Sequence, residues 1–175
     1  PELRRALEKL GRTKFITKSR FISDRHKARI IREVLEAIRI LKDNEVGALI
    51  VFQRETGLSE YIEDAITLNA ELSTEMLLSI FFPKSPLHDG AVIVSQDKIL
   101  AASAILPVSD TKKSFTYGTR HRAALGISEN SDAFCLVVSE ERGVVSLVND
   151  GKIEVSASGT SGTVEFSNDG GINWQ

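Results

Sequence analysis

Apolar residues recur along this chain with two different spacings, which predict helices and strands in alternation. Across residues 23–44 they fall every three to four positions, with polar residues between them. This spacing is typical of an amphipathic helix with one buried face, and Ser23 or Asp24 is placed to cap its first turn. Three shorter helices are predicted at residues 2–10, 73–82 and 119–128, and Ser73 is expected to cap the second of them.

Short continuous apolar runs predict strands that are buried in a sheet. The clearest is GALIVFQ at residues 47–53, and the dipeptide Asp150-Gly151 predicts a tight hairpin turn between the last two strands. Helices and strands interleave, and several neighbouring strands are spaced for hairpins. We therefore predict an α/β fold with a mixed, twisted central β-sheet flanked by helices on both faces. The other predicted strands lie at residues 91–95, 98–106, 133–139, 143–149 and 152–158.

The composition is that of an ordinary globular domain rather than of a nucleic-acid coat or a membrane span. The chain has 175 residues, of which 42% are hydrophobic and 26% charged, and its net charge is −2. A near-neutral chain is a poor candidate for coating nucleic acid, and no apolar run reaches the roughly 18 residues that a spanning helix needs. The single cysteine, Cys135, lies in an apolar run and is predicted to be a buried small side chain, which fits a reducing compartment.

The first candidate for chemistry is the sequence LHDG at residues 87–90, directly before a predicted buried strand. One interpretation is a simple Asp-Gly turn. The other is a metal site, because Mg²⁺ and Mn²⁺ take one or two carboxylates together with phosphate oxygens, and Asp89 supplies a carboxylate. Gly90 would let the backbone approach a ligand closely, and His88 would add a nitrogen ligand suited to Mn²⁺.

The second candidate is GTRHR at residues 118–122, which opens a predicted helix with two arginines and a histidine. A helix N-terminus already carries partial positive charge, so added cations there indicate an anion as the partner. Backbone amides, the Thr119 hydroxyl and the guanidinium groups of Arg120 and Arg122 together suit a polyphosphate. The alternatives are an exposed basic turn and an arginine-rich contact to nucleic acid, which the 6% aromatic content does not favour.

The third candidate is the acidic end of a predicted strand, where Ser139, Glu140 and Glu141 precede a turn. These acids either face solvent or supply a second metal carboxylate. Two common nucleotide-binding signatures, G-x-x-x-x-G-K-[ST] and G-x-G-x-x-G, are absent from the sequence. From the residues alone we therefore predict a triphosphate and divalent-metal site on a mixed α/β domain, with no reaction assigned.

Taken together, these motifs resemble those of the diadenylate cyclase family, whose members make cyclic di-AMP. Asp89-Gly90-Ala91 and Arg120-His121-Arg122 match the family's DGA and RHR motifs, and the similarity runs in order over roughly residues 14 to 155. It is strongest to the membrane-bound cyclic di-AMP synthases. The resemblance implies a metal-dependent nucleotidyltransferase that condenses two ATP molecules into cyclic di-AMP and two pyrophosphates at the two-fold interface of a homodimer.

The resemblance also implies roles for individual residues. Asp89 is expected to lie near the ribose 3′-hydroxyl with the metal, Mn²⁺ or Mg²⁺, and to help deprotonate that hydroxyl. Gly90 belongs to the same catalytic motif, and His88 and Glu141 are expected to complete the metal shell. The RHR residues count as catalytic and also bind nucleotide. The residues expected to hold the triphosphate are Thr119, Arg120, His121, Arg122 and Ser139, and those expected near the adenine are Leu49, Ile105 and Leu106.

By the same resemblance, residues 1–158 form the catalytic domain, with 1–12 as a helix or linker from a membrane region, and residues 159–175 form a tail with no assigned role. The domain would then face the cytoplasm from a membrane-tethered parent protein. A membrane regulator and phosphoglucosamine mutase are the implied partners, and no nucleic acid is expected. Two other functions stay open: a sensor that binds ATP or cyclic di-AMP without turnover, and a nucleic-acid-associated domain.

Overall fold

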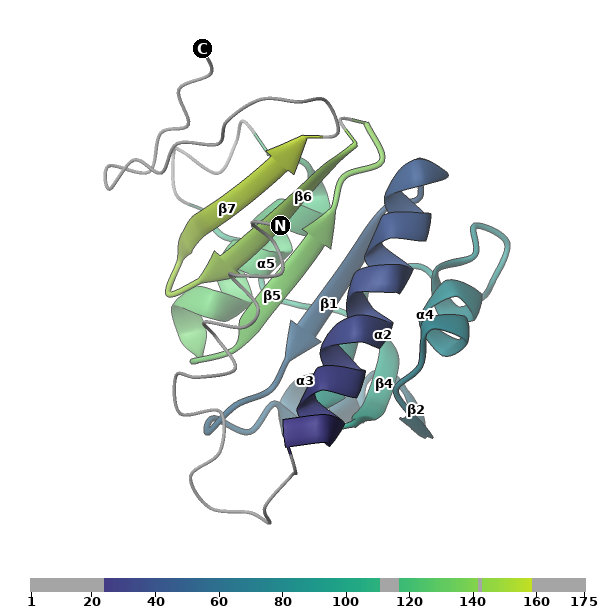
Figure 1. Cartoon of the computed structure of the whole chain (residues 1–175). Coiled ribbons are helices and arrows are strands. Elements are labelled where there is room, and N and C mark those ends of the chain that lie inside the picture. The colour runs from purple at the N-terminus through teal and green to yellow at the C-terminus, as the bar shows by residue number, and fades with distance from the viewer. Residues whose placement is uncertain (1–23, 111–116, 142, 159–175) are drawn as a thin grey trace.

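The computed structural model of the chain describes residues 24–110, 117–141 and 143–158, which form a single sheet with helices packed on it (Figure 1). The predicted helix at residues 2–10 and the tail at 159–175 lie outside the described residues. The helices are α2 (Asp24–Asp43), α3 (Ser59–Glu63), α4 (Thr74–Phe81) and α5 (Thr119–Asn130). The strands are β1 (Ala48–Phe52), β2 (Ile66–Glu71), β3 (Ala91–Ser95), β4 (Lys98–Ala104), β5 (Phe134–Val138), β6 (Val144–Asn149) and β7 (Lys152–Ser158).

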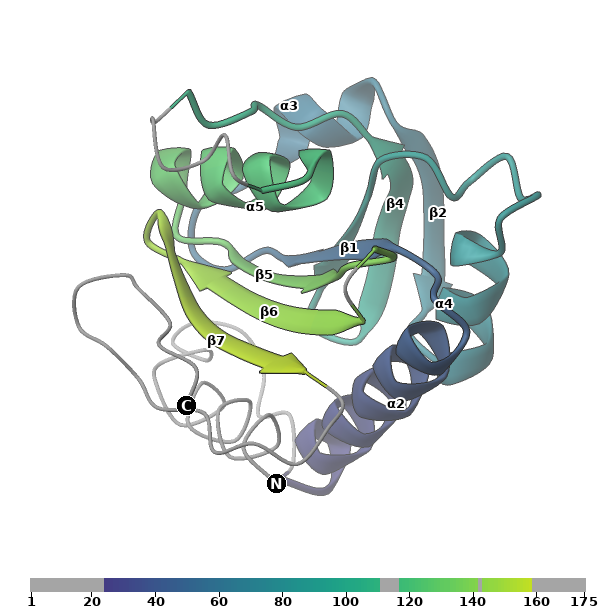
Figure 2. The ribbon, with the colours of Figure 1, turned by 90° about the horizontal axis from the view of Figure 1, so that it is seen from above.

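The sheet is mixed, as predicted. Its strand order is β2-β4-β3-β1-β5-β6-β7. β1 and β3 run parallel, whereas the other neighbouring pairs in this order are antiparallel. Figure 2 shows the sheet strongly twisted between its β2 edge and its β7 edge, as a sheet of L-residues is expected to be.

Helices cover both faces of the sheet, which confirms the prediction. α2 and α4 pack on one face over a core that includes Ile50 and Leu136, and α3 and α5 pack on the other face over a core that includes Leu49 and Val137. Figure 2 shows the two pairs of helices on opposite sides of the strands. Successive residues of β1 therefore enter opposite cores, which explains why this strand is apolar without alternation.

α2 buries one face on the sheet and ends in a tight turn that leads into β1. Glu45 takes a left-handed backbone with φ 56°, and the Val46 N–H donates to the carbonyl of Leu41 over 2.8 Å. Such a turn satisfies carbonyl groups that the end of a helix leaves open. It delivers the chain to Gly47, directly before β1. Among the described helices, none combines the length with the apolar character that a bilayer crossing requires.

Several local predictions are confirmed. Ser73 caps α4, because its Oγ accepts the Met76 N–H at 3.2 Å. Asp150 and Gly151 have φ angles of 48° and 67°, as a tight hairpin turn between β6 and β7 demands. Cys135 is buried, and its burial raises the pKa of the thiol. It is therefore a packing residue and not a reactive thiolate.

The hydrophobic pattern missed α3 and β2, which lie between β1 and α4. β2 is an edge strand with mostly exposed side chains, so it carries no apolar run. Its pairing with β4 shifts register between Thr67 and Ala70, and Asn69 within that step has φ 49°. A bulge of this kind discourages further strands from adding to the edge. The C-terminal ends of two elements differ from the predicted ranges by two residues: β4 ends at Ala104, before the predicted end at Leu106, and α5 continues to Asn130, beyond Ser128.

Candidate active site

One end of the sheet brings the candidate motifs together, and we call it the site end. β1 and β3 are parallel and begin here, and the antiparallel strands β4 and β5 finish here. Ala48 accordingly pairs with Val138, and Ala91 pairs with Ala104. The HDG loop before β3, the loop after β4 and the acidic turn after β5 are therefore neighbours, although they are far apart in the sequence.

The loop that enters β3 is built around Gly90. Its φ is 99°, and a Cβ atom there would lie 2.8 Å from the carbonyl oxygen of Ala104. Only glycine fits such a position. The close approach that Gly90 makes in this structure is to β4, and its close approach to a ligand stays a prediction. Asp89, the preceding residue, is exposed, so its carboxylate is open to solvent at the site end.

His88 is half-buried and is held within the same loop. Its Nδ1 lies 2.6 Å from the carbonyl oxygen of Ser85. Because a carbonyl oxygen can only accept, Nδ1 carries the proton, and Nε2 is the ring nitrogen that can bind a metal. The loop is further tied to β4 by the Ser103 Oγ, which donates to the carbonyl of Pro86 over 3.4 Å.

α5 presents its N-terminus at the site end. Gly118 precedes the helix in an extended conformation and supplies no side-chain cap, and the first helical turn contains no acidic residue. Thr119 is exposed, and Arg122 is half-buried. The partial positive charge of the helix start is thus combined with a hydroxyl and two guanidinium groups, which is the arrangement that an anion site requires.

Arg120 is anchored rather than freely exposed. Its Nη1 donates to Oε2 of Glu140 over 3.1 Å, and its side chain is 24% exposed against 55% for Glu140. The exposed basic turn considered for this motif does not describe Arg120. The guanidinium instead has a fixed neighbour on the turn between β5 and β6.

His121 turns into the core, which the sequence analysis did not anticipate. It is 8% exposed, its Nε2 lies 3.0 Å from Oγ of buried Ser146 on β6, and its ring stacks on Tyr117 with 5.6 Å between ring centroids. The expected contact between His121 and the triphosphate stays a prediction. The structure gives this side chain a second role, because it fixes the start of α5 to the sheet.

The residues expected near the adenine differ sharply in exposure. Ile105 is 81% exposed, whereas Leu106 and Leu49 are 7% and 2% exposed within the core beneath α5. Ile105 thus has apolar surface to offer a base, and the two leucines have almost none. They support the site from below, and their direct contact with adenine stays a prediction.

The loop after β4 is held against α5. A Cβ atom on Gly126 would lie 2.7 Å from the carbonyl carbon of Pro107, so the helix and the loop touch at that glycine. The Ser109 N–H donates to the carbonyl of Arg122 over 3.0 Å, and the Ser109 Oγ donates to Glu129 over 2.8 Å. The position of Ile105 at the site end is therefore set by α5.

The acidic turn after β5 supplies the last candidates. Ser139 is half-buried, and its N–H and carbonyl bond to Val144 and Gly143, which closes the turn, while Glu140 and Glu141 are exposed. In the described part of the chain, no three His, Cys, Asp or Glu side chains gather as metal ligands. The metal shell of Asp89, His88 and Glu141 that the resemblance implies stays a prediction. An exposed carboxylate such as Asp89 still suits a hard cation that takes its other oxygens from a triphosphate.

Sequence reasoning missed three residues that shape this site. Gly47 lies under the Arg120 guanidinium, Ser146 holds His121, and Ser109 holds the loop of Ile105. For His121 a signal existed: it precedes the buried residues Ala124 and Leu125 by three and four positions, which is the helical period. The contacts of Gly47, Ser146 and Ser109 are long-range and have no local signal.

Comparison with known proteins gives a consistent result. The family model described as DisA bacterial checkpoint controller nucleotide-binding, or DAC, matches residues 35–153. Cyclic di-AMP synthase CdaA of Bacillus subtilis and a diadenylate cyclase of Listeria monocytogenes are each 46% identical over 154 residues, which cover 87% of this chain and 56% of theirs. The chain thus spans about half the length of these curated relatives.

Solved structures support the fold as well. The crystal structure of a double mutant of DacA from Staphylococcus aureus superposes with a TM-score of 0.72 at 48% identity and covers 74% of this chain and 87% of that one. A hypothetical membrane spanning protein from Bacillus cereus gives a TM-score of 0.67 at 46% identity, covering 70% of this chain and 60% of that one. With the DGA loop and the RHR helix start at one end of a mixed sheet, the chain belongs to the DAC family of nucleotide-binding domains.

Proposed function

We propose that this chain is the catalytic domain of a diadenylate cyclase, which joins two ATP molecules into cyclic di-AMP and releases two pyrophosphates. The observation that carries the proposal is that an exposed Asp89 and a cationic helix start lie at the same end of the sheet. Similarity to proteins named diadenylate cyclase supports it. Together they favour a nucleotidyl transfer over binding alone.

The roles follow from the chemistry of each group. The uncapped start of α5, with Thr119, Arg120 and Arg122, binds the triphosphate and neutralises charge that builds up on the α-phosphate and on the leaving pyrophosphate. Ser139, on the neighbouring turn, adds a hydroxyl to the same phosphates. Asp89 accepts the proton of a ribose 3′-hydroxyl, whose oxygen then bonds to the α-phosphorus as the bond to pyrophosphate breaks.

A divalent cation fits this scheme. Asp89 would hold Mg²⁺ or Mn²⁺ together with triphosphate oxygens, and Nε2 of His88 and the Glu141 carboxylate are the further ligands we propose. When bound, the cation would neutralise phosphate charge and favour loss of the hydroxyl proton. Ile105 covers the base with apolar surface, and His121 keeps the helix start in place.

The reaction is symmetric, so we propose that the active species is a homodimer. Each ATP must present its 3′-hydroxyl to the α-phosphate of the other, and two copies of one site related by a two-fold axis achieve this with a single set of residues. A single subunit then binds ATP without cyclising it. The proposal extends to a membrane-tethered parent with this domain on the cytoplasmic side, and to a membrane regulator and phosphoglucosamine mutase as its partners.

Product analysis by mass spectrometry tests the proposal. The chain is incubated with ATP and either Mg²⁺ or Mn²⁺, and Asp89→Asn is the matched variant. We expect cyclic di-AMP from the wild type and a loss on the order of 100-fold or more in the variant, because a positioned base typically contributes about 10²–10⁴. Binding of an uncleavable ATP analogue should be largely retained, since the cationic start of α5 is untouched. ATP binding without any dinucleotide, in either metal, would instead identify a sensor.

A further inference from the structure

A side chain at Gly47 would displace the ends of the Arg120 and Glu140 side chains, and the backbone conformation of Gly47 does not itself require glycine. Its φ angle is not positive, so an L-residue can adopt the same φ. A Cβ atom there would nevertheless lie 2.8 Å from Cζ of Arg120, closer still to Nη1, and 2.7 Å from Oε2 of Glu140. The guanidinium of the RHR motif therefore rests directly on the backbone of Gly47, and a larger residue at position 47 would push the guanidinium away from this place.

Glu140 holds the same guanidinium from the side. Arg120 Nη1 donates to its Oε2 over 3.1 Å. A charge-assisted hydrogen bond of this kind restricts a long side chain that would otherwise sample many rotamers. One residue thus supports the arginine from below, and the other fixes its direction.

Both residues lie on well-fixed backbone. Gly47 follows the turn that Val46 closes on α2 and precedes Ala48, which pairs with Val138 of β5. Glu140 lies two residues beyond Val138, on the turn that Ser139 closes by its bonds across to β6. The two contacts on Arg120 therefore come from residues that adjoin the start of β1 and the end of β5, which are adjacent strands of one sheet.

We infer that Gly47 and Glu140, here called the positioning pair, set the place and direction of the Arg120 guanidinium for binding the nucleotide triphosphate. The inference rests on the proposed function in that Arg120 is taken as a phosphate ligand. In this inference both members of the pair act through Arg120 and not through contacts of their own with the nucleotide. Glu140 is an anion near an anion site, and its net effect on binding is nevertheless favourable because it orients the cation.

The test is a set of binding measurements on the full 175-residue chain. The ligand is adenosine 5′-(α,β-methylene)triphosphate with Mg²⁺, which cannot release pyrophosphate, and the method is isothermal titration calorimetry. The variants are Gly47→Ala and Glu140→Ala, each alone and combined with Arg120→Ala. Gly57→Ala and Glu63→Ala are the matched controls, because a Cβ at Gly57 meets only Ser59 Oγ at 3.9 Å and Glu63 is exposed on α3.

We expect each pair variant to weaken binding about tenfold, and Glu140→Gln, which keeps an acceptor oxygen, to weaken it about threefold. In the Arg120→Ala background both losses should vanish, since there is no guanidinium left to position. Arg120→Lys replaces that background if binding to Arg120→Ala is too weak to measure. Glu140 is exposed, so its variants keep the test open even if Gly47→Ala does not fold.

Three results would overturn the inference: losses no larger than those of the controls, losses that persist in full without Arg120, or tighter binding by Glu140→Ala. The last would make Glu140 a competing anion rather than a positioning residue. The analogue cannot be cyclised, so these results do not depend on turnover. Absence of cyclic di-AMP from ATP would contradict the proposed function and leave the binding cycle intact.

Discussion

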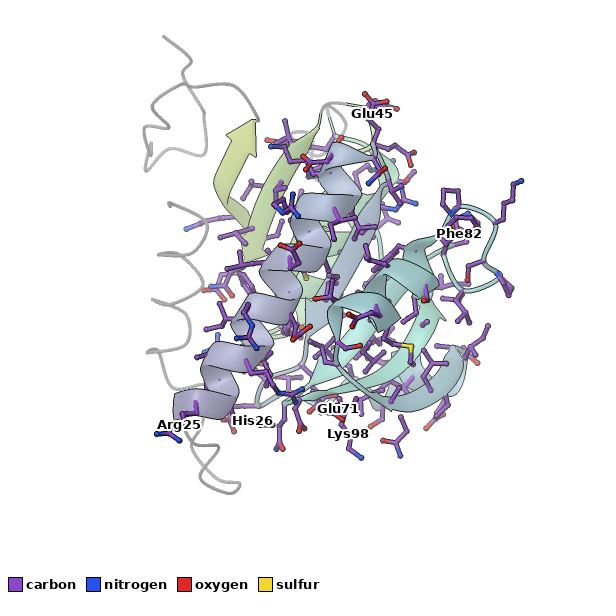
Figure 3. All side chains as sticks on the ribbon, turned by 45° about the vertical axis from the view of Figure 1, so that its right-hand side comes forward. Arg25, His26, Glu45, Glu71, Phe82 and Lys98 are labelled. Atoms are coloured by element: carbon purple, nitrogen blue, oxygen red, sulfur yellow. The ribbon has the colours of Figure 1, made fainter. Side chains whose placement is uncertain are left out.

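The two ends of the sheet differ in how much of their polar surface is left open to solvent. At the end away from the site, polar side chains are bonded to other parts of the fold. The Asp132 carboxylate accepts the backbone N–H groups of Glu55 and Thr56 at 3.1 and 3.0 Å, which ties the start of β5 to the loop after β1. His26 of α2 likewise meets Asp97 of the β3–β4 turn at 3.0 Å, and Figure 3 shows His26 at the start of that helix.

The site end keeps several of its polar groups exposed and holds others, such as Arg120 and His121, by contacts within the fold. Asp89, Thr119 and Glu141 are exposed, and the contacts that fix their surroundings involve Gly90 and buried His121. The comparison teaches that the same sheet supplies stability at one end and a preorganised surface at the other. Variants of exposed groups at the site end should therefore change activity, variants at the other end should change stability, and variants of the constraints beneath the site should change both.

The largest effect in this comparison is expected from Gly90→Ala, which strains the site end. A Cβ there meets the Ala104 carbonyl, and φ of 99° disfavours any L-residue. We expect the free energy of unfolding to fall by about 1–3 kcal/mol. The rate of cyclic di-AMP formation should fall at least about tenfold at a temperature where the variant is folded, because Asp89 is displaced.

Urea unfolding and the product assay measure both effects, and Gly57→Ala is the control. A Cβ at Gly57 meets no close neighbour, so its free energy of unfolding should change by less than about 0.5 kcal/mol. Equal behaviour of the two glycine variants would show that Gly90 is not a constraint on the site.

Asp132→Asn should change stability and leave the activity per folded molecule unchanged. Burial acts to raise the pKa of Asp132, but the N–H donors of Thr56 and Glu55, with Arg54 nearby, outweigh it and lower the pKa below 3.8. The stabilisation is thus present above the ordinary pKa and is lost as pH falls through the lowered one. We expect the variant to lose about 1 kcal/mol at pH 7.

The pH dependence sharpens this expectation. The difference in unfolding free energy between wild type and Asp132→Asn should hold from pH 7 down to about 5 and shrink below the ordinary pKa of 3.8. Urea titrations across that range measure it. A constant difference down to pH 2, or a fall in activity at pH 7, would break the division between the two ends.

The smallest effect is expected from Ile105→Ser at the site end. Ile105 is 81% exposed, so its loss should leave the free energy of unfolding within about 0.5 kcal/mol of the wild type. If its apolar surface covers a base, KM for ATP should rise about threefold to tenfold, since partial burial of one apolar side chain is worth about 1 kcal/mol. Steady-state kinetics measure the change, and an unaltered KM would remove Ile105 from the site.

Much of the fold was predictable because its central parts follow simple periods. α2 has a clear apolar stripe, β1 and β5 are apolar runs buried on both faces, and Asp150-Gly151 forms the expected hairpin turn. β2 was not predicted because its side chains are mostly exposed, so this edge strand has no hydrophobic run or alternation that would mark it. The failures thus lie where tertiary position, and not local sequence, decides the structure.

The site was predictable in its motifs and not in its contacts. Asp89 and the start of α5 could be found from their residue types at element boundaries. The inward turn of His121, the anchoring of Arg120 and the contact of Gly47 depend on which strands are neighbours. β1 and β5 are neighbours because they pair antiparallel, and their residues are far apart in the sequence. No local sequence pattern encodes such a pairing.

The most direct test of the central claim is the rate of cyclic di-AMP formation per chain, measured by mass spectrometry over a wide range of chain concentrations at saturating ATP. If the site end is one half of a two-fold reaction centre, the rate per chain should rise with concentration and level off as the dimer saturates. A constant rate per chain down to concentrations where light scattering shows only monomer would contradict the shared site. Absence of the dinucleotide at every concentration would contradict the proposed reaction.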